Sequence, residues 1–328
     1  MRMRFVFVMD PMDRVTADKD STYAFMRAAQ ARGHQSFHTL PSELYFDGSD
    51  LFAHVREVKV HPPAPGVHHF AVGETTLMRV ADAEAVFIRK DPPFDVPYLY
   101  ATLLLEKLRG RMLVVNDPRG LRDANEKIYA LNFLPYMPKT FVGASRDRIF
   151  EFVKSIGGRA VIKPLYGAGG AGVLQVFEGD KNARSIVDLL TVEGRELVMV
   201  QEFLPLVEEG DKRVILLEGK LLGAINRIPR KDDIRSNIHA GGRVEPTKLS
   251  AEEKAIVEAV APRLVKDGLY FVGLDIVGGK LTEVNVTSPT GIQELSLHEN
   301  RDVAEDVIAW AEKKSREFRA DLRSMPPM

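Results

Sequence analysis

Short apolar runs and amphipathic stretches alternate along the first 120 or so residues. Runs of strand length lie at residues 5–9, 85–88 and 112–115, a hairpin pattern lies at 43–56, and helix-like stretches lie at 20–32 and 97–109. Strands that alternate with helices usually form a parallel sheet with helices on both faces. The pattern therefore predicts an N-terminal α/β domain over residues 1–121.

Beyond residue 121 the strand signals come in consecutive pairs, which is typical of antiparallel hairpins. Helix-like stretches lie at 123–131, 146–156, 183–190, 251–266 and from about 300, and strand-like runs at 159–163, 172–177, 197–201, 213–217, 220–228, 271–277 and 281–286. We expect two α+β subdomains, residues 122–204 and 205–318, followed by a tail at 319–328.

Composition narrows the functional classes. The chain has 45 Lys and Arg against 46 Asp and Glu, a net charge of −1, so neither nucleic acid nor an acidic membrane surface is an expected partner. It has no cysteine, which excludes disulfides, thiolate metal sites and cysteine nucleophiles. No apolar run approaches the roughly 20 residues of a membrane span, and the N-terminal run is too short for a signal peptide. We therefore expect a cytoplasmic protein.

Three oxygen-bearing side chains, Asp275, Glu283 and Asn285, lie in an otherwise apolar hairpin. Strand side chains alternate between faces, so Glu283 and Asn285 share one face. Two carboxylates and an amide are suitable ligands for Mg²⁺ when phosphate oxygens occupy its other positions. The alternative is a hairpin with one solvent-exposed face, which would carry Lys, Thr or Ser at least as often as acids.

The metal site constrains the register of this hairpin. A two-residue turn at Gly278 and Gly279 would place Asp275 opposite Thr282, and Glu283 would then face away. A three-residue connection or an equivalent bulge pairs Asp275 with Glu283. We expect one of these, with residues 277 and 281 on the ligand face and residues 274, 276, 284 and 286 on the core face.

A glycine-rich segment follows the strand that ends near Lys163. Its glycines are Gly167, Gly169, Gly170 and Gly172. Such a loop leaves backbone amides free to bind phosphate oxygens, and Lys163 is placed at its rim. It is neither a P-loop nor a Rossmann fingerprint, because no Gly-Lys-Ser/Thr and no helix follow. A tight hairpin alone would explain about half of the glycines, and a lysine there could be a solvated strand end.

Further polar groups stand at strand ends. An apolar strand ends in Gln201, Glu202, Phe203 and Leu204, a segment that could join two subdomains and bind an adenine edge or could simply reach the surface. Arg213 opens one strand of a hairpin and Arg227 lies near the end of the other, and the polar loop that follows contains Asn237, Gly241 and Gly242, which suggests a lid over an anionic substrate. Asp10 and Arg89 end N-terminal strands, where open α/β sheets bind ligands.

Several strings of this sequence are similar to those of bacterial glutathione synthetases. They are Met9-Asp10-Pro11, Ile88-Arg89-Lys90-Asp91-Pro92-Pro93-Phe94-Asp95, Leu121-Arg122-Asp123-Ala124-Asn125-Glu126-Lys127, Lys163-Pro164-Leu165, Gly210-Asp211-Lys212-Arg213, Ala240-Gly241-Gly242-Arg243, and Leu281-Thr282-Glu283-Val284-Asn285-Val286-Thr287-Ser288-Pro289-Thr290-Gly291. The strings occur in order along nearly the whole chain.

The resemblance implies an ATP-grasp fold, with ATP between the two α+β subdomains, and a role for each matching residue. It implies phosphate binding by Lys127, Lys163 and the glycine loop, adenine and ribose contacts by 201–204 and Asp211, reacting-end contacts by Arg213, Arg227 and Asn285, a metal held by Asp275, Glu283 and Asn285, and peptide contacts by Asp10, Arg89, Asn237, Gly241, Gly242, Ser288, Pro289 and Thr290. The implied metal is Mg²⁺, with Mn²⁺ as a substitute, and the implied assembly is a homotetramer.

The implied reaction joins γ-glutamylcysteine and glycine with ATP through an acyl phosphate, giving glutathione, ADP and phosphate. It asks the protein mainly for positioning and charge neutralisation, with Arg213, Arg227 and Lys163 as the catalytic candidates. Two alternatives stay open from the sequence. One is another carboxylate–amine ligase that acts on amino acids or proteins, and the other is a non-catalytic ATP-binding regulatory module.

Overall fold

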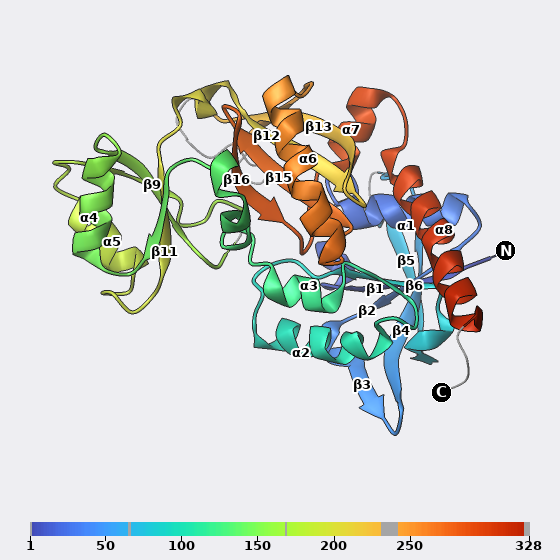
Figure 1. Ribbon diagram of the computed structural model, residues 1–328. Coiled ribbons are helices and arrows are strands. Elements are labelled where there is room, and N and C mark those ends of the chain that lie inside the picture. Colours follow the sequence, from blue (N-terminus) through green and yellow to red (C-terminus); the bar gives the residue numbers. More distant parts are fainter. Residues whose placement is uncertain (1, 65–66, 168, 231–241, 325–328) are drawn as a thin grey trace.

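The computed structural model describes residues 2–64, 67–167, 169–230 and 242–324 and contains three β-sheets (Figure 1). The N-terminal sheet comprises β1 (Arg4–Met9), β2 (Gln35–Thr39), β3 (Leu44–Asp47), β4 (Asp50–Val60), β5 (Phe70–Arg79), β6 (Ala85–Arg89) and β7 (Leu113–Val115). Strands β2, β1, β6 and β7 run parallel in that order, and β4, β3 and β5 extend the sheet in antiparallel pairing. The expected parallel sheet is therefore present, with an antiparallel extension.

Both faces of the parallel strands are covered, which explains why β1 is an uninterrupted apolar run. Phe5 and Phe7 pack in one cluster with α1 (Ser21–Ala31) and α8 (Val303–Ser324). Val6 and Val8 face the opposite cluster, which includes residues of α2 (Val96–Leu105) and α3 (Pro118–Asp123).

A four-stranded antiparallel sheet forms a lobe that stands apart on the left of Figure 1. Its strands are β8 (Thr140–Gly143), β9 (Arg159–Pro164), β10 (Leu174–Phe177) and β11 (Val198–Glu202), in the order β10-β9-β11-β8. Helices α4 (Arg146–Ser155) and α5 (Ala183–Leu190) contribute Ile149, Val153 and Val187 to its small core.

A five-stranded antiparallel sheet faces this lobe. It comprises β12 (Asp211–Leu217), β13 (Lys220–Ile228), β14 (Arg243–Pro246), β15 (Phe271–Val277) and β16 (Lys280–Asn285), in the order β14-β13-β12-β15-β16. Helix α6 (Ala251–Lys266) packs on it through Ile256, Val260 and Leu264, and α7 (Ile292–Glu299) leads into α8. Both sheets of this half are antiparallel, as the hairpin pattern predicted.

Two expectations from the sequence were wrong in detail. The helix predicted at 123–131 is replaced by α3, which ends at Asp123, and by the 3-10 segment Tyr129–Tyr136. The break has a local cause, because Asn125 Oδ1 accepts hydrogen bonds from the backbone N–H groups of Lys127 and Ile128, both at 3.0 Å.

The predicted tail was also misplaced. Helix α8 continues to Ser324 and lies against α1 of the N-terminal domain (Figure 1), so residues 319–324 are helical. Phe318 packs against the core, and Arg319 Nη2 donates to Glu84 Oε1 at 2.7 Å, which anchors the last turns. Residues 325–328 lie outside the described part of the chain.

Candidate active site

A cavity of about 650 Å³ is lined by residues of all three sheets. Arg89 reaches it from the carboxyl end of β6, Lys163 from β9, and Asp275 from β15. Most of the side chains singled out in the sequence line this cavity, namely Arg89, Lys127, Lys163, Gly167, Gly169, Gly170, Gln201, Glu202, Phe203, Leu204, Asp211, Arg213, Arg227, Asp275, Glu283, Asn285, Ser288, Pro289 and Thr290.

The β15–β16 hairpin brings Asp275 opposite Glu283, as the metal-site argument required. The turn itself has two residues, because Val277 pairs with Lys280 and Ile276 with Leu281. Thr282 is then an extra residue on β16, and this bulge restores the Asp275–Glu283 pair. The equivalent-bulge alternative is therefore confirmed.

One part of the register prediction was wrong. Leu281 pairs with Ile276 and is fully buried in the core with it, instead of sharing the ligand face with Val277. The reason is the position of the bulge. Residues 280 and 281 follow the register of the two-residue turn, which places Leu281 on the core face, and the extra residue Thr282 then brings Glu283 onto the ligand face. Leu274, Ile276, Val284 and Val286 fill the core as expected.

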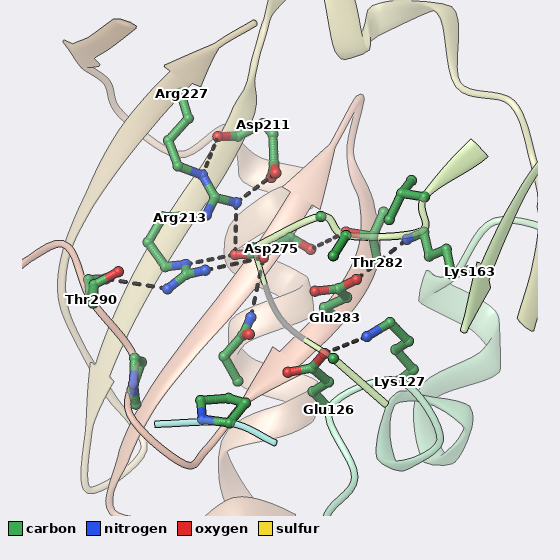
Figure 2. Close-up of a pocket in the computed structure, with 18 of the residues that line it drawn as sticks. Glu126, Lys127, Lys163, Asp211, Arg213, Arg227, Asp275, Thr282, Glu283 and Thr290 are labelled. Atoms are coloured by element: carbon green, nitrogen blue, oxygen red, sulfur yellow. Dashed lines mark hydrogen bonds and ion pairs between the residues drawn. The ribbon is translucent and has the colours of Figure 1, made fainter. Parts of the chain in front are cut away.

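Asp275 lies at the centre of a buried charge network (Figure 2). Its Oδ1 accepts from Arg213 Nε at 2.7 Å and lies 3.0 Å from Arg227 Nη2. Its Oδ2 accepts from Arg213 Nη2 at 3.2 Å and from Asn285 Nδ2 at 3.1 Å. Burial alone would raise the pKa of Asp275, but the charges of the two arginines outweigh it and hold that pKa below its usual range.

Two more carboxylates, Glu126 and Glu283, approach the same part of the cavity. Glu126 forms an ion pair with Lys127, and Glu283 Oε1 lies 3.6 Å from Lys163 Nζ. Burial raises the pKa of Glu126, and the negative charge of Glu283 raises it further. The cavity therefore holds clustered carboxylates beside two lysines, each of which is paired with one of them.

The donor set fits a divalent metal, although no three Asp, Glu, His or Cys side chains of the described residues already converge on one point. Asp275 and Glu283 are cross-strand partners, and Asn285 adds an amide oxygen on the same hairpin. Magnesium commonly takes one or two carboxylates and completes its shell with water and phosphate oxygens. The repulsion that raises the pKa of Glu126 is relieved by a bound cation.

The glycine loop connects β9 to β10 at the mouth of the cavity. Gly167, Gly169, Gly170 and Gly172 have φ values of 104°, 67°, 74° and 73°, a region that other residues rarely adopt. A Cβ at Gly172 would also lie 3.0 Å from the Pro164 ring. The glycines are thus required by the loop conformation, while Ala168 lies outside the described residues.

The end of β11 supplies the segment that the sequence placed between two subdomains. Gln201 is the ladder partner of Val161, and both line the cavity. Glu202 Oε1 accepts from the backbone N–H of Lys139 at 3.1 Å, and the Arg159 guanidinium lies 3.4 Å from the centre of the Phe203 ring. These contacts fix the segment against the small lobe.

Arg89 and residues 288–290 meet at the N-terminal side of the cavity. Arg89 Nη2 donates to the Pro289 carbonyl at 3.0 Å, and Arg213 Nη1 donates to the neighbouring Thr290 carbonyl at 3.2 Å. Asp10 does not line the cavity; its Oδ2 accepts from the backbone N–H of Asp91 at 2.8 Å. Gly242 does not line it either, and Asn237 and Gly241 lie outside the described residues.

Sequence reasoning missed several lining residues, notably Asp20, Asp91, Glu126 and Thr282. The adjacency of Glu126 to Lys127 was a usable signal, but the incorrect helix at 123–131 concealed it. Asp91 stood inside the string after Arg89, where an acid beside two basic residues was also visible. Asp20 carried no such signal, because an acid before a helix is an ordinary N-cap.

Two antiparallel sheets that enclose a cavity with a glycine loop, two lysines and clustered carboxylates define the ATP-grasp class of proteins. Solved structures agree: the ATP-grasp ligase PsnB complexed with minimal precursor has a TM-score of 0.65 at 17% identity, covering 96% of this chain and 100% of that chain. D-alanine–D-alanine ligase from Bacillus anthracis has a TM-score of 0.57 at 12% identity, covering 98% and 99%. The ATP-grasp family implies use of ATP and of a divalent metal.

The chain belongs to the prokaryotic glutathione synthetase family. The model of its N-terminal domain matches residues 3–122, and the model of its ATP-grasp domain matches residues 126–300. A glutathione synthetase of Synechocystis sp. is 44% identical over 320 residues, which cover 95% of this chain and 100% of the relative. One from Rhodopseudomonas palustris is 40% identical over 314 residues, covering 96% and 99%. Among the described residues, no helix is both long enough and apolar enough to cross a bilayer.

Proposed function

We propose that this protein is a glutathione synthetase, which joins γ-glutamylcysteine to glycine with the conversion of ATP to ADP and phosphate. The observation that carries the proposal is the match of both family domains along the chain, together with a single cavity that gathers the matching residues. The intact Asp275, Glu283 and Asn285 set argues against a non-catalytic ATP-binding module.

The reaction has two steps. The cysteinyl carboxylate attacks the γ-phosphorus of ATP, which forms an acyl phosphate and releases ADP. The amine of glycine then attacks the acyl carbon, the amide bond forms, and phosphate leaves as the amine loses its proton. Neither step needs a nucleophile from the protein, which is consistent with the absence of cysteine.

The charged side chains of the cavity have different roles in these two steps. Lys127 and Lys163 bind the phosphates, with the glycine loop amides of residues 167–172 around them. Arg213 and Arg227, held in place by Asp275, face the acyl phosphate and stabilise the charge that develops on it. Gln201 to Leu204 line the adenine, and Asp211 lies toward the ribose.

Asp275, Glu283 and Asn285 hold the metal in this proposal, with Mg²⁺ as the physiological ion and Mn²⁺ as a substitute. When bound, a divalent ion neutralises phosphate charge and orients the transferred group. Arg89 and residues Ser288 to Thr290 bind the peptide, whereas residues 231–241 of the expected lid, with Asn237 and Gly241, lie outside the described part of the chain. We also propose a cytoplasmic homotetramer, which sedimentation of the purified protein would test.

The decisive experiment measures ADP release and the mass of the product. We expect ADP only when γ-glutamylcysteine, glycine, ATP and Mg²⁺ are all present, with glutathione formed in equal amount. Equal ADP release with another carboxylic acid and no γ-glutamyl peptide would instead establish a different carboxylate–amine ligase.

A further inference from the structure

One end of the cavity contains a buried cation that no described carboxylate pairs with. Arg89 is 4% exposed, and its guanidinium lies between the rings of Phe25 and Phe271, 5.5 and 5.4 Å from their centres. Its hydrogen bonds go to neutral groups, Thr22 Oγ1 and the Pro289 carbonyl, both at 3.0 Å. Burial lowers the pKa of Arg89, and the nearest opposing charges are those of Asp20 and Asp91.

Asp91 and Asp20 line the same end of the cavity, and neither forms an ion pair with a described residue. The backbone of Asp91 is fixed, because its N–H donates to Asp10 Oδ2 at 2.8 Å and its carbonyl accepts from Lys90 Nζ at 2.7 Å. Its carboxylate is hydrogen-bonded to Ser288, and burial raises its pKa. Asp20 uses Oδ1 to cap α1, accepting from the Thr22 and Tyr23 amides at 2.6 and 3.0 Å.

Arg89 is buried and has lost water without gaining a carboxylate partner among the described residues, which is costly, whereas Asp91 is exposed within the open cavity. A fold under no other constraint would let Arg89 contact one of these carboxylates. Here the hydrogen bonds to Thr22 and Pro289 keep the Arg89 guanidinium from reaching the Asp91 carboxylate. The anchored backbone of Asp91 likewise keeps that carboxylate from reaching Arg89. A ligand with an ammonium and a carboxylate group on one carbon would satisfy both charges at once.

This argument rests on the proposed function, because the γ-glutamyl residue is such a zwitterion at the end remote from the reacting carboxylate. Arg89 and Arg213 are anchored to the same loop, since they bind the carbonyls of two consecutive residues, Pro289 and Thr290. We infer that Asp91, with Asp20 beside it, binds the α-ammonium group of the γ-glutamyl residue while Arg89 binds its α-carboxylate. The pair thereby selects substrates that have a free α-amino group.

The test compares γ-glutamylcysteine with N-glutarylcysteine, which differs only in lacking the α-amino group. We expect the wild type to favour γ-glutamylcysteine by about a hundredfold in kcat/KM, because the analogue lacks the ammonium group that pairs with the Asp91 carboxylate. Asp91→Asn should lower kcat/KM for γ-glutamylcysteine by a similar factor, mainly through KM. It should change kcat/KM for the analogue by only a few fold, so that most of the discrimination is lost.

Asp123→Asn is the matched control, since Asp123 is exposed at the end of α3 and does not line the cavity; it should keep both values. Equal use of the two peptides by the wild type would overturn the inference without requiring any variant. A uniform loss with both peptides in Asp91→Asn, or a rise in KM for glycine alone, would overturn it as well. If the wild type releases no ADP with γ-glutamylcysteine and glycine, the proposed function itself fails, and the inference fails with it.

Discussion

At the residue scale, Asp275 shows how neighbours determine what a carboxylate can do. Four donor contacts from Arg213, Arg227 and Asn285 fix both of its oxygens (Figure 2). The carboxylate stays ionised although it is 5% exposed, because two guanidinium charges compensate for the lost water. Within the described part of the chain, its cross-strand partner Glu283 has one ion-pair contact, to Lys163, and so retains more freedom to bind a metal.

This difference leads to a prediction for Glu283→Gln. The amide keeps the size of the side chain, so the variant should fold, but turnover should fall by at least about a hundredfold because a ligand of the metal that neutralises transition-state charge is lost. Steady-state kinetics at saturating Mg²⁺ measure this. Glu258→Gln, on the exposed face of α6, should retain wild-type turnover. Wild-type turnover in Glu283→Gln would exclude Glu283 as a metal ligand.

At the scale of elements, α8 crosses from the C-terminal half to the N-terminal sheet and is attached there by Glu312. Glu312 Oε1 accepts from Arg32 Nε at 2.5 Å and lies 2.8 Å from His34 Nε2. His34 Nδ1 in turn accepts from the Met3 backbone N–H at 3.2 Å. The hydrogen bond from Arg32 is the main reason that the pKa of Glu312 falls to about 2.

The lowered pKa predicts how the stability of the α8 attachment depends on pH. The ionised Glu312 stabilises the folded state fully above its ordinary pKa of 4.5, and this contribution is lost as the pH falls towards about 2. Glu312→Gln should therefore lower Tm at pH 7, because a hydrogen bond to a charged group contributes about 1.5–3 kcal/mol to the free energy of unfolding. The difference in Tm from the wild type should shrink below pH 4.5.

Glu317→Gln is the control for this measurement, because Glu317 lies on the same helix and is half exposed with only weak ion pairs at 3.7 and 3.9 Å. It should change stability by less than about 0.5 kcal/mol. A Tm difference for Glu312→Gln that stays constant from pH 7 to pH 3 would show that packing, rather than charge, accounts for the effect.

At the scale of the whole molecule, the small lobe meets the rest of the chain around the cavity. Asn125 Nδ2 donates to the Leu165 carbonyl at 2.8 Å, and Lys163 Nζ of β9 lies 3.6 Å from Glu283 Oε1 of β16. The 201–204 segment provides a further connection. In the proposed function a nucleotide in the cavity would contact both lobes, so its binding should stabilise their arrangement.

We therefore expect a non-hydrolysable ATP analogue with Mg²⁺ to raise Tm by several degrees. At a ligand concentration a hundredfold above Kd, the stabilisation is about 2.7 kcal/mol. Differential scanning fluorimetry would measure it. Removal of the metal by EDTA should reduce the shift in the wild type, whereas Glu283→Gln should show the smaller shift with or without Mg²⁺. A wild-type shift that is unaffected by EDTA would contradict coupled binding of metal and nucleotide.

The sequence by itself determined the class of the protein, the hairpins and most of the side chains in the cavity. Alternation and apolar runs depend on which faces of an element are buried, so they predicted the β12–β13 hairpin. The pairing of Asp275 with Glu283 followed from the requirement that metal ligands share one face of the hairpin. Short motifs such as the one that contains Glu283 consist of consecutive residues, so they can be recognised in the sequence without knowledge of the tertiary structure.

Only the tertiary structure decided which distant side chains meet. Asp20, Asp91 and Ser288 come from segments far apart in the chain, and their common cavity depends on the order of strands and on how the sheets pack. The packing of α8 against α1 was likewise decided only by the tertiary structure. Periodicity reports burial along one element but carries no information about which element covers it, because any apolar face of suitable shape satisfies the same pattern.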